Sequence, residues 1–151
     1  MRRSVQPSGT TLVELAVTLL VVGILAGLAA PPFGRGLDRL AVRGARDVLA
    51  VSVARARTIA VARGGARLAL DVADATVRIV SVDDGAEVEP AVDLHERYGI
   101  ALAVDGGRDE AVEIRFDGLG IGRSLGATIR IRRGAAEAGI TVSAYGRVRT
   151  W

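Results

Sequence analysis

A lone carboxylate, Glu14, lies near the start of the most apolar segment of this 151-residue chain. Residues 15–30 carry no charge, and the next basic residue after them is Arg35. A carboxylate surrounded by hydrocarbon costs about 2.5–3.5 kcal/mol on insertion scales, so it requires a positive partner. Because the segment contains none, we expect the partner of Glu14 to be an amine that is created by cleavage or brought by another chain.

Cleavage after Gly9 would create such an amine. The new N-terminal residue would be Thr10, four residues before Glu14 and on about the same face of a helix. In an assembly, the amine of one subunit would then pair with the Glu14 carboxylate of its neighbour. Gly9 and Thr10 are therefore candidate processing residues, and Glu14 is a candidate assembly residue.

The apolar segment has the length of a membrane span. Residues 10–30 are 21 in number, or roughly 31 Å of helix at about 1.5 Å per residue, which matches a bilayer core. Arg2 and Arg3 are the only charges before it, so the positive-inside bias places this end in the cytoplasm. A secretory signal peptide would have a shorter apolar region followed by a cleavage site. We therefore expect a single-pass transmembrane helix.

Residues that support catalysis or metal binding are sparse. His95 is the single histidine and the chain has no cysteine, whereas a metal site needs three or four converging ligands. A Ser-His-Asp triad would also depend on His95, which we expect in a solvated loop. The glycines of 118–122 match part of a dinucleotide-binding pattern, but no helix is predicted to follow them. We therefore expect no enzymatic activity, no metal or other cofactor and no small-molecule substrate.

Charge is unevenly distributed along the chain. Residues 64–121 carry five arginines and thirteen acidic residues, whereas residues 122–151 carry six arginines and one acidic residue. Within this basic tail, Arg147 and Arg149 are two residues apart and therefore share one face of a strand. Two interpretations stay open: a strand face that is solvated or pairs with the acidic middle of a neighbouring subunit, and a phosphate-binding patch.

Hydrophobic periodicity predicts one long helix after the leader, from Thr10 to about Arg63. Pro31 and Pro32 interrupt its backbone bonding and predict a kink or a local melt near Pro31. The helical pattern resumes at Leu37, and Gly64-Gly65 ends it. The second half is expected to cover a sheet with a broad apolar face made of two rows. The first row is Leu37, Leu40, Ala41, Gly44, Val48 and Val51, and the second is Ala45, Leu49, Ser52, Ala56 and Ala60.

After Gly65 the period changes to two, which indicates antiparallel β-strands joined by short links. Strands are expected at 67–72, 76–82, 99–104, 111–116, 127–131 and 140–145, with 147–151 as an extension of the last one. Asp83-Asp84-Gly85 is predicted as a turn. The expected fold class is therefore α+β, with a long N-terminal helix packed on an antiparallel sheet or sandwich over residues 64–151.

The N-terminal residues carry a family resemblance. Gly9 followed by Thr10-Thr-Leu-Val-Glu14 resembles the processing motif of type IV prepilins, in which a membrane peptidase cuts after the glycine and N-methylates the new amine. Thr10 stands where that family usually has phenylalanine. The resemblance implies a cleaved leader over 1–9, prepilin peptidase as a partner, and recruitment through Glu14 into a filament that grows from the bacterial inner membrane.

The rest of the chain resembles the GspH/FimT branch of this superfamily. The similar stretches are the helix end at 48–63, Ile114–Gly118, Ile140–Ser143 and Gly146–Arg149. The resemblance implies a pilin-like fold and a minor pseudopilin of type II secretion, which assembles with other pseudopilins and exposes residues 64–151 to the periplasm. The alternative that it implies is a FimT-like minor type IV pilin, whose Gly-Arg-x-Arg tail, here with Arg147 and Arg149, contacts DNA during uptake.

Overall fold

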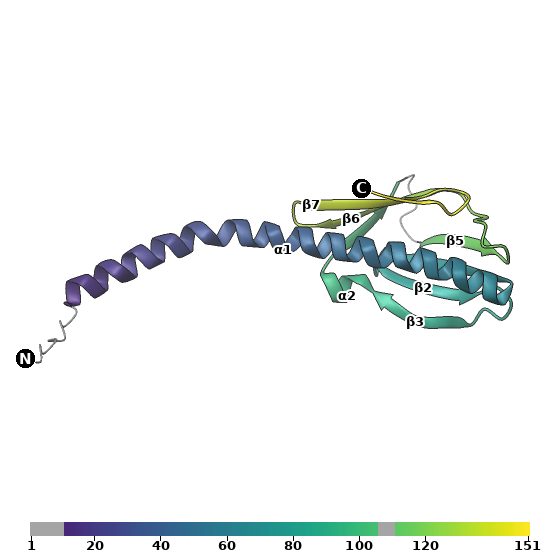
Figure 1. The fold of residues 1–151 in the computed structure, drawn as a ribbon, viewed down its shortest axis with the longest axis horizontal. Helices are drawn as coiled ribbons and strands as arrows, with labels where there is room; N and C mark the ends of the chain where they lie inside the picture. The colour runs from purple at the N-terminus through teal and green to yellow at the C-terminus, as the bar shows by residue number, and fades with distance from the viewer. Residues whose placement is uncertain (1–10, 106–110) are drawn as a thin grey trace, which may run out of the picture. The chain divides into compact units, whose positions relative to one another are not determined.

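The computed structural model describes residues 11–105 and 111–151, with the backbone alone for 28–33. By its internal contacts the chain divides into two units, residues 1–34 and 35–151, which are described separately. Helix α1 (Leu12–Arg63) begins in the first unit and ends in the second (Figure 1). The expected leader, with Gly9 and Thr10, lies outside the described residues.

In the first unit, α1 exposes its apolar side chains. Every large apolar side chain from Leu12 to Leu25 is about half exposed or more, and Leu12 is 84% exposed. The backbone of α1 is helical through Pro31 and Pro32, and the kink expected there stays a prediction. Among the described residues, no helix is long and apolar enough to qualify as a membrane span.

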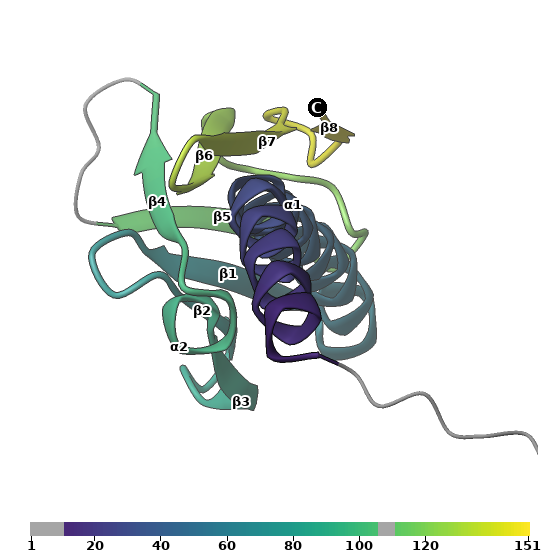
Figure 2. The same cartoon turned by 90° about the vertical axis from the view of Figure 1, so that its left-hand side faces the viewer.

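The second unit contains two four-stranded antiparallel sheets. The first has the order β3-β2-β1-β5, from β1 (Gly65–Asp71), β2 (Thr76–Ser81), β3 (Glu87–Asp93) and β5 (Ala111–Asp117). The second has the order β4-β6-β7-β8, from β4 (Ala101–Val104), β6 (Ala127–Arg133), β7 (Ala136–Val142) and β8 (Val148–Thr150). Short helix α2 (Leu94–Tyr98) connects β3 to β4. Figure 2 shows the second half of α1 beside both sheets.

One stripe of α1 provides the helical part of the core. Its buried residues are Val42, Ala45, Leu49, Ser52, Val53, Ala56 and Ala60. They pack with inward-facing residues of both sheets, such as Leu68 on β1 and Ile129 on β6. The expected row from Ala45 to Ala60 is therefore confirmed as core.

The prediction that the other row, from Leu37 to Val51, lies in the core is mostly wrong. Leu37, Leu40 and Val51 are 61%, 66% and 51% exposed. At about 100° per residue, Leu37 and Leu49 point about 120° apart around the helix. The sheets cover the side that carries Leu49, and spacings of three and four residues cannot show which of two such rows will be covered.

Strand β3 was not predicted from the sequence. It is the edge strand of the first sheet, and most of its side chains are exposed or half-buried. An edge strand tolerates Pro90 and charged residues such as Glu87 and Glu89, because its outer backbone groups need no ladder partner. Such a strand lacks the alternation of buried and exposed residues by which strands are recognised.

Helix α2 corrects the placement of His95, which we expected in a solvated loop. The Asp93 carboxylate accepts the Glu96 amide at 2.7 Å and so caps the start of α2. Gly99 ends the helix with φ of 63°, a left-handed conformation that favours glycine. His95 lies on this helix, with its Nδ1 3.0 Å from the Ile100 carbonyl oxygen.

The C-terminal residues form a separate strand instead of extending the previous one. β7 ends at Val142, the chain turns, and β8 returns antiparallel to β7 with Val142 opposite Val148. Gly146 has a φ of 81° within this turn, a conformation that side chains other than glycine rarely adopt. The expected strand over 140–145 with an extension at 147–151 is therefore wrong, because the backbone reverses at the glycine.

Leu49→Ala is expected to lower the free energy of unfolding by about 2–5 kcal/mol, because truncating a fully buried leucine leaves a cavity. The same change at the exposed Leu40 should alter it by less than about 0.5 kcal/mol. Urea unfolding of residues 35–151, followed by circular dichroism, would measure both. Equal losses would show that both rows of α1 lie in the core.

Candidate functional site

Glu14 lies in the first turn of α1 and is exposed. Its backbone amide donates to Thr11 Oγ1 at 3.3 Å, and Thr11-x-x-Glu14 has the spacing of a capping box. A carboxylate at a helix N-terminus also interacts favourably with the helix dipole. This local role was not predicted from the sequence, although the spacing of Thr11 and Glu14 was visible there.

The Glu14 carboxylate is available to a partner from outside the described residues. In the part of the chain that the structure describes, Glu14 takes part in no ion pair. Its expected partner, the amine of Thr10, belongs to residues that are not described. The structure therefore places Glu14 at the start of the exposed apolar part of α1. The pairing of its carboxylate with an N-terminal amine stays a prediction.

Arg147 and Arg149 lie on either side of Val148, at the edge of the second sheet. Val148 is half-buried and packs against the core. Because side chains alternate along a strand, the two arginines point to the opposite, solvent-facing side. Both are exposed. The structure thus brings together the two arginines that the sequence placed on one face.

These two arginines differ from the other basic residues of the second sheet. The β6 arginines all have acidic partners: Arg130 with Asp105, Arg132 with Glu137, and Arg133 with Asp38. Arg147 and Arg149 belong to none of the ion pairs among residues 11–105 and 111–151. No described carboxylate therefore offsets the charge of these two arginines.

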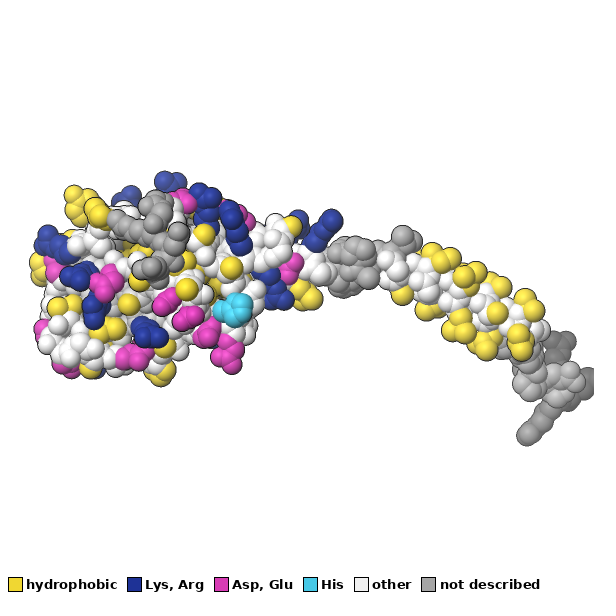
Figure 3. Space-filling view, turned by 180° about the vertical axis from the view of Figure 1, so that it is seen from behind, with side chains coloured by type: hydrophobic (Ala, Val, Ile, Leu, Met, Phe, Trp, Pro, Cys, Tyr) yellow, Lys and Arg dark blue, Asp and Glu magenta, His cyan; other side chains and the backbone are white. Residues whose placement is uncertain are grey.

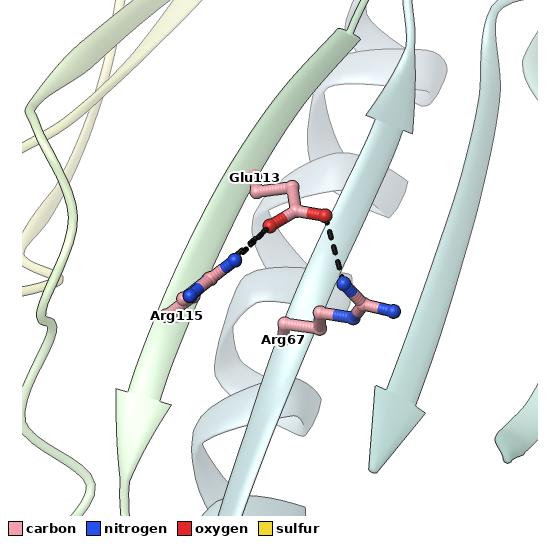
Figure 4. Close-up of polar contacts among 3 residues, drawn as sticks. All are labelled: Arg67, Glu113 and Arg115. Atoms are coloured by element: carbon pink, nitrogen blue, oxygen red, sulfur yellow. Dashed lines mark hydrogen bonds and ion pairs between the residues drawn. The ribbon is translucent and has the colours of Figure 1, made fainter. Parts of the chain in front are cut away.

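The outer face of the first sheet shows the contrasting arrangement (Figure 4). Glu113 on β5 accepts hydrogen bonds from Arg67 on β1 at 3.0 Å and from Arg115 at 2.8 Å. The bond from Arg115 is the main cause that lowers the pKa of Glu113 below its usual value. Exposed pairs of this kind contribute little stability, but they offset the charge of both arginines.

Arg57 on α1 holds the turn that precedes Arg147. Its Nη2 donates to the carbonyl oxygens of Tyr145 at 3.3 Å and of Gly146 at 2.9 Å. The guanidinium carbon lies 5.5 Å from the centre of the Phe116 ring, within the range of a cation–π contact. Arg57 therefore joins α1, β5 and the turn, a role that the sequence did not reveal.

Close packing fixes the same turn from the other side. A side chain at Gly146 would collide with Phe116 and with the guanidinium of Arg57. The amide of Gly122 donates to the Tyr145 carbonyl at 3.2 Å, and a Cβ at Gly122 would meet the backbone of 144–146 at 2.5–2.6 Å. The turn is thus held by contacts with α1, β5 and the loop that follows β5.

Two aromatic residues lie beside the tail arginines. Tyr145 is 77% exposed and Trp151 is 52% exposed. Trp151 exchanges two backbone hydrogen bonds with Gly139, at 3.0 and 3.1 Å, and its indole fills the space that a side chain at Gly139 would need. Both rings keep an exposed surface next to the basic edge strand.

Arg57→Met is expected to speed amide hydrogen exchange at Gly122 and Gly146, because the change removes the two bonds that anchor the turn. Exchange measured residue by residue by NMR on residues 35–151 would test it. Arg55→Met is the matched control, since Arg55 is two residues away and pairs instead with Glu89 at 3.1 Å. Faster exchange in both variants would point to general destabilisation instead of a specific anchor.

The sequence matches no protein-family model and no curated protein. The structure, in contrast, is similar to the crystal structure of the type IV minor pilin FimU from Pseudomonas aeruginosa. The TM-score is 0.55 at 15% sequence identity, over 73% of this chain and 87% of that one. The chain therefore has the type IV pilin-like fold, in which part of a long N-terminal helix packs on antiparallel β-sheets.

Proposed function

We propose that the protein is a minor pseudopilin, a non-catalytic structural subunit of a type II secretion pseudopilus. The observation that carries the proposal is the position of Glu14. It lies in the first turn of an exposed apolar helix, five residues after Gly9, in a chain with the type IV pilin-like fold. A plain membrane anchor would need neither the glycine nor the carboxylate.

In the proposed assembly cycle, prepilin peptidase removes residues 1–9 and methylates the amine of Thr10. Residues 10–30 hold the subunit in the inner membrane, and residues 64–151 lie in the periplasm. The amine of one subunit then pairs with Glu14 of the next, which offsets the cost of a carboxylate in an apolar environment. The exposed apolar side chains of α1, from Leu12 to Leu25, support packing against lipid and other helices.

Glu14→Gln is expected to leave cleavage intact and to block incorporation into the filament. Glutamine keeps the size of the side chain and suits the same position of a capping box, so the helix start is preserved and only the charge is lost. Immunoblots of sheared filaments and of membranes, from cells that carry the rest of the secretion system, would separate incorporation from leader removal. Incorporation of Glu14→Gln at the level of the unchanged chain would contradict the role of the charge.

A second candidate function is DNA binding by a minor type IV pilin. The observation that favours it is the solvent-facing pair Arg147 and Arg149, which lack carboxylate partners among the described residues, beside the exposed Tyr145 and Trp151. Arginines bind phosphates, and aromatic rings stack on bases. Two phosphate contacts would give weak and salt-sensitive binding.

Under this second proposal, residues 35–151 bind a labelled DNA duplex in fluorescence anisotropy. The logarithm of the affinity should fall with the logarithm of salt with a slope of about −1.8, because each phosphate contact contributes about −0.9. Arg147→Ala/Arg149→Ala should abolish binding. The control variant Arg67→Ala/Arg115→Ala also loses two positive charges, those of the arginines that share Glu113. It should keep its DNA binding. Absence of binding at low salt, with the fragment folded, would leave the pseudopilin proposal alone.

A further inference from the structure

Two hollows lie along one face of α1, the first beside the start of β7 and the second beside the turn before β8. One hollow of about 370 Å³ is lined by Arg39, Arg43 and Arg46 of α1 and by Trp151, together with residues 135–138 and Val42. A second of about 510 Å³ is lined by Ala50, Val53, Ala54 and Arg57 of α1 and by residues 145–148. The helical residues follow one another at spacings of three and four, so they form one face of α1. We call both hollows together the α1–β8 groove.

The chemistry of this groove is basic at its rim and apolar in its middle. Arg39 and Arg43 take part in no ion pair among the residues that the structure describes. Ala50, Val53 and Ala54 line the middle. An extended segment that alternates carboxylates with small apolar side chains would satisfy both parts, whereas a nucleic acid backbone would leave the apolar part uncovered.

The opposite flank of α1 carries such a segment, the β3–α2 edge of the first sheet. Strand β3 reads Glu87-Val-Glu-Pro-Ala-Val-Asp93, and no strand of the described residues pairs with its outer edge. The acidic residues along this edge and in the turn before it are Asp83, Asp84, Glu87, Glu89, Asp93 and Glu96. Of these, Glu89 is the one whose carboxylate takes part in a described ion pair, with Arg55.

Figures 1 and 2 show β3 on one flank of α1 and the strands β7 and β8 on the other. In the space-filling view most carboxylates lie on the lower half of the domain, whereas arginines lie along its top and also across its left end and middle (Figure 3). Within one copy, α1 separates the groove from the acidic edge. Contact between the two surfaces therefore requires a second copy.

We propose that the α1–β8 groove of one copy binds the β3–α2 edge of a second copy. Arg39 and Arg43 meet carboxylates such as Glu87 and Glu96, and the exposed Pro90 and Ala91 of β3 cover the middle of the groove. The two surfaces differ, so the contact between the two copies is head-to-tail. The inference rests on the proposed role as an assembly subunit and names the surface that such a subunit uses.

Cysteine cross-linking tests the contact. The chain contains no cysteine, so no native thiol competes with the introduced ones. Full-length chains with Ala54→Cys, in the groove, are mixed in detergent with chains that carry Ala91→Cys, on β3. An added mild oxidant takes one electron and one proton from each thiol to form the disulfide. The matched control pairs Ala54→Cys with Ala101→Cys, an exposed position on β4 at another edge.

The expected result is a mixed disulfide between positions 54 and 91 that clearly exceeds the control pair. Its yield should fall between about 0.1 M and 1 M salt, as the screening length drops from about 10 Å to about 3 Å. Arg39→Glu/Arg43→Glu in one chain, or Glu87→Arg/Glu96→Arg in the other, should each reduce it at least severalfold, because like charges then meet. Combining the two reversals should restore it. A yield equal to the control, or no restoration, would overturn the proposal.

The same assay separates this inference from the proposed function. Glu14→Gln in both chains should leave the cross-link unchanged, because the contact uses residues of the second unit. A chain that is processed and incorporated normally but gives no 54–91 cross-link would overturn the inference alone. A chain that cross-links but is neither cleaved nor incorporated would overturn the proposed function and leave the contact standing.

Discussion

Ala45, Ala56 and Ala60 are fully buried on α1, in the stripe that packs with residues of both sheets. Each sheet has one apolar face that must be covered, and the second half of α1 contributes to covering both. The core that results consists mainly of aliphatic residues, with Leu49 and Phe116 among its largest members. The positions of the sheet edges follow from this contact, because α1 occupies the space between β3 and β8.

The same contact explains why the turn before β8 is so well fixed. Arg57 lies one residue after the buried Ala56, so packing of the stripe sets the position of its guanidinium. From there it reaches the carbonyls of Tyr145 and Gly146. Because the turn is fixed in this position, β8 aligns with β7. This alignment directs Arg147 and Arg149 to the solvent-facing side. The helix thereby determines where the unmatched charge of the second sheet lies.

Glu14 depends on a different constraint. A carboxylate at this position is favourable at a water-exposed helix start, where Thr11 Oγ1 accepts the Glu14 amide, and costly in an apolar environment. In the proposed assembly the helix start lies in an apolar environment, so the carboxylate requires a positive partner there. This requirement gives a physical reason for Glu14 to serve the proposed assembly contact.

Much of this architecture was predictable from the amino-acid sequence. Periods of three to four and of two residues predicted α1 to its end at Arg63 and most of the strands, and the Gly9–Glu14 spacing identified the candidate assembly residue. The pair Arg147 and Arg149 was also predicted to share one face. These features are local, since each depends on residues within a few positions of one another.

The remaining features were decided by tertiary structure. Which of two apolar rows on α1 is buried depends on where the sheets lie, and Leu40 and Leu49 look alike without them. Strand β3 forms because its backbone pairs with that of β2. Its sequence, which includes Glu87 and Pro90, lacks the alternation of apolar and polar residues that predicts a strand. The contacts of Arg57 that hold the reversal at Gly146 join residues far apart in the chain. Long-range packing chooses between alternatives that local periodicity leaves equivalent.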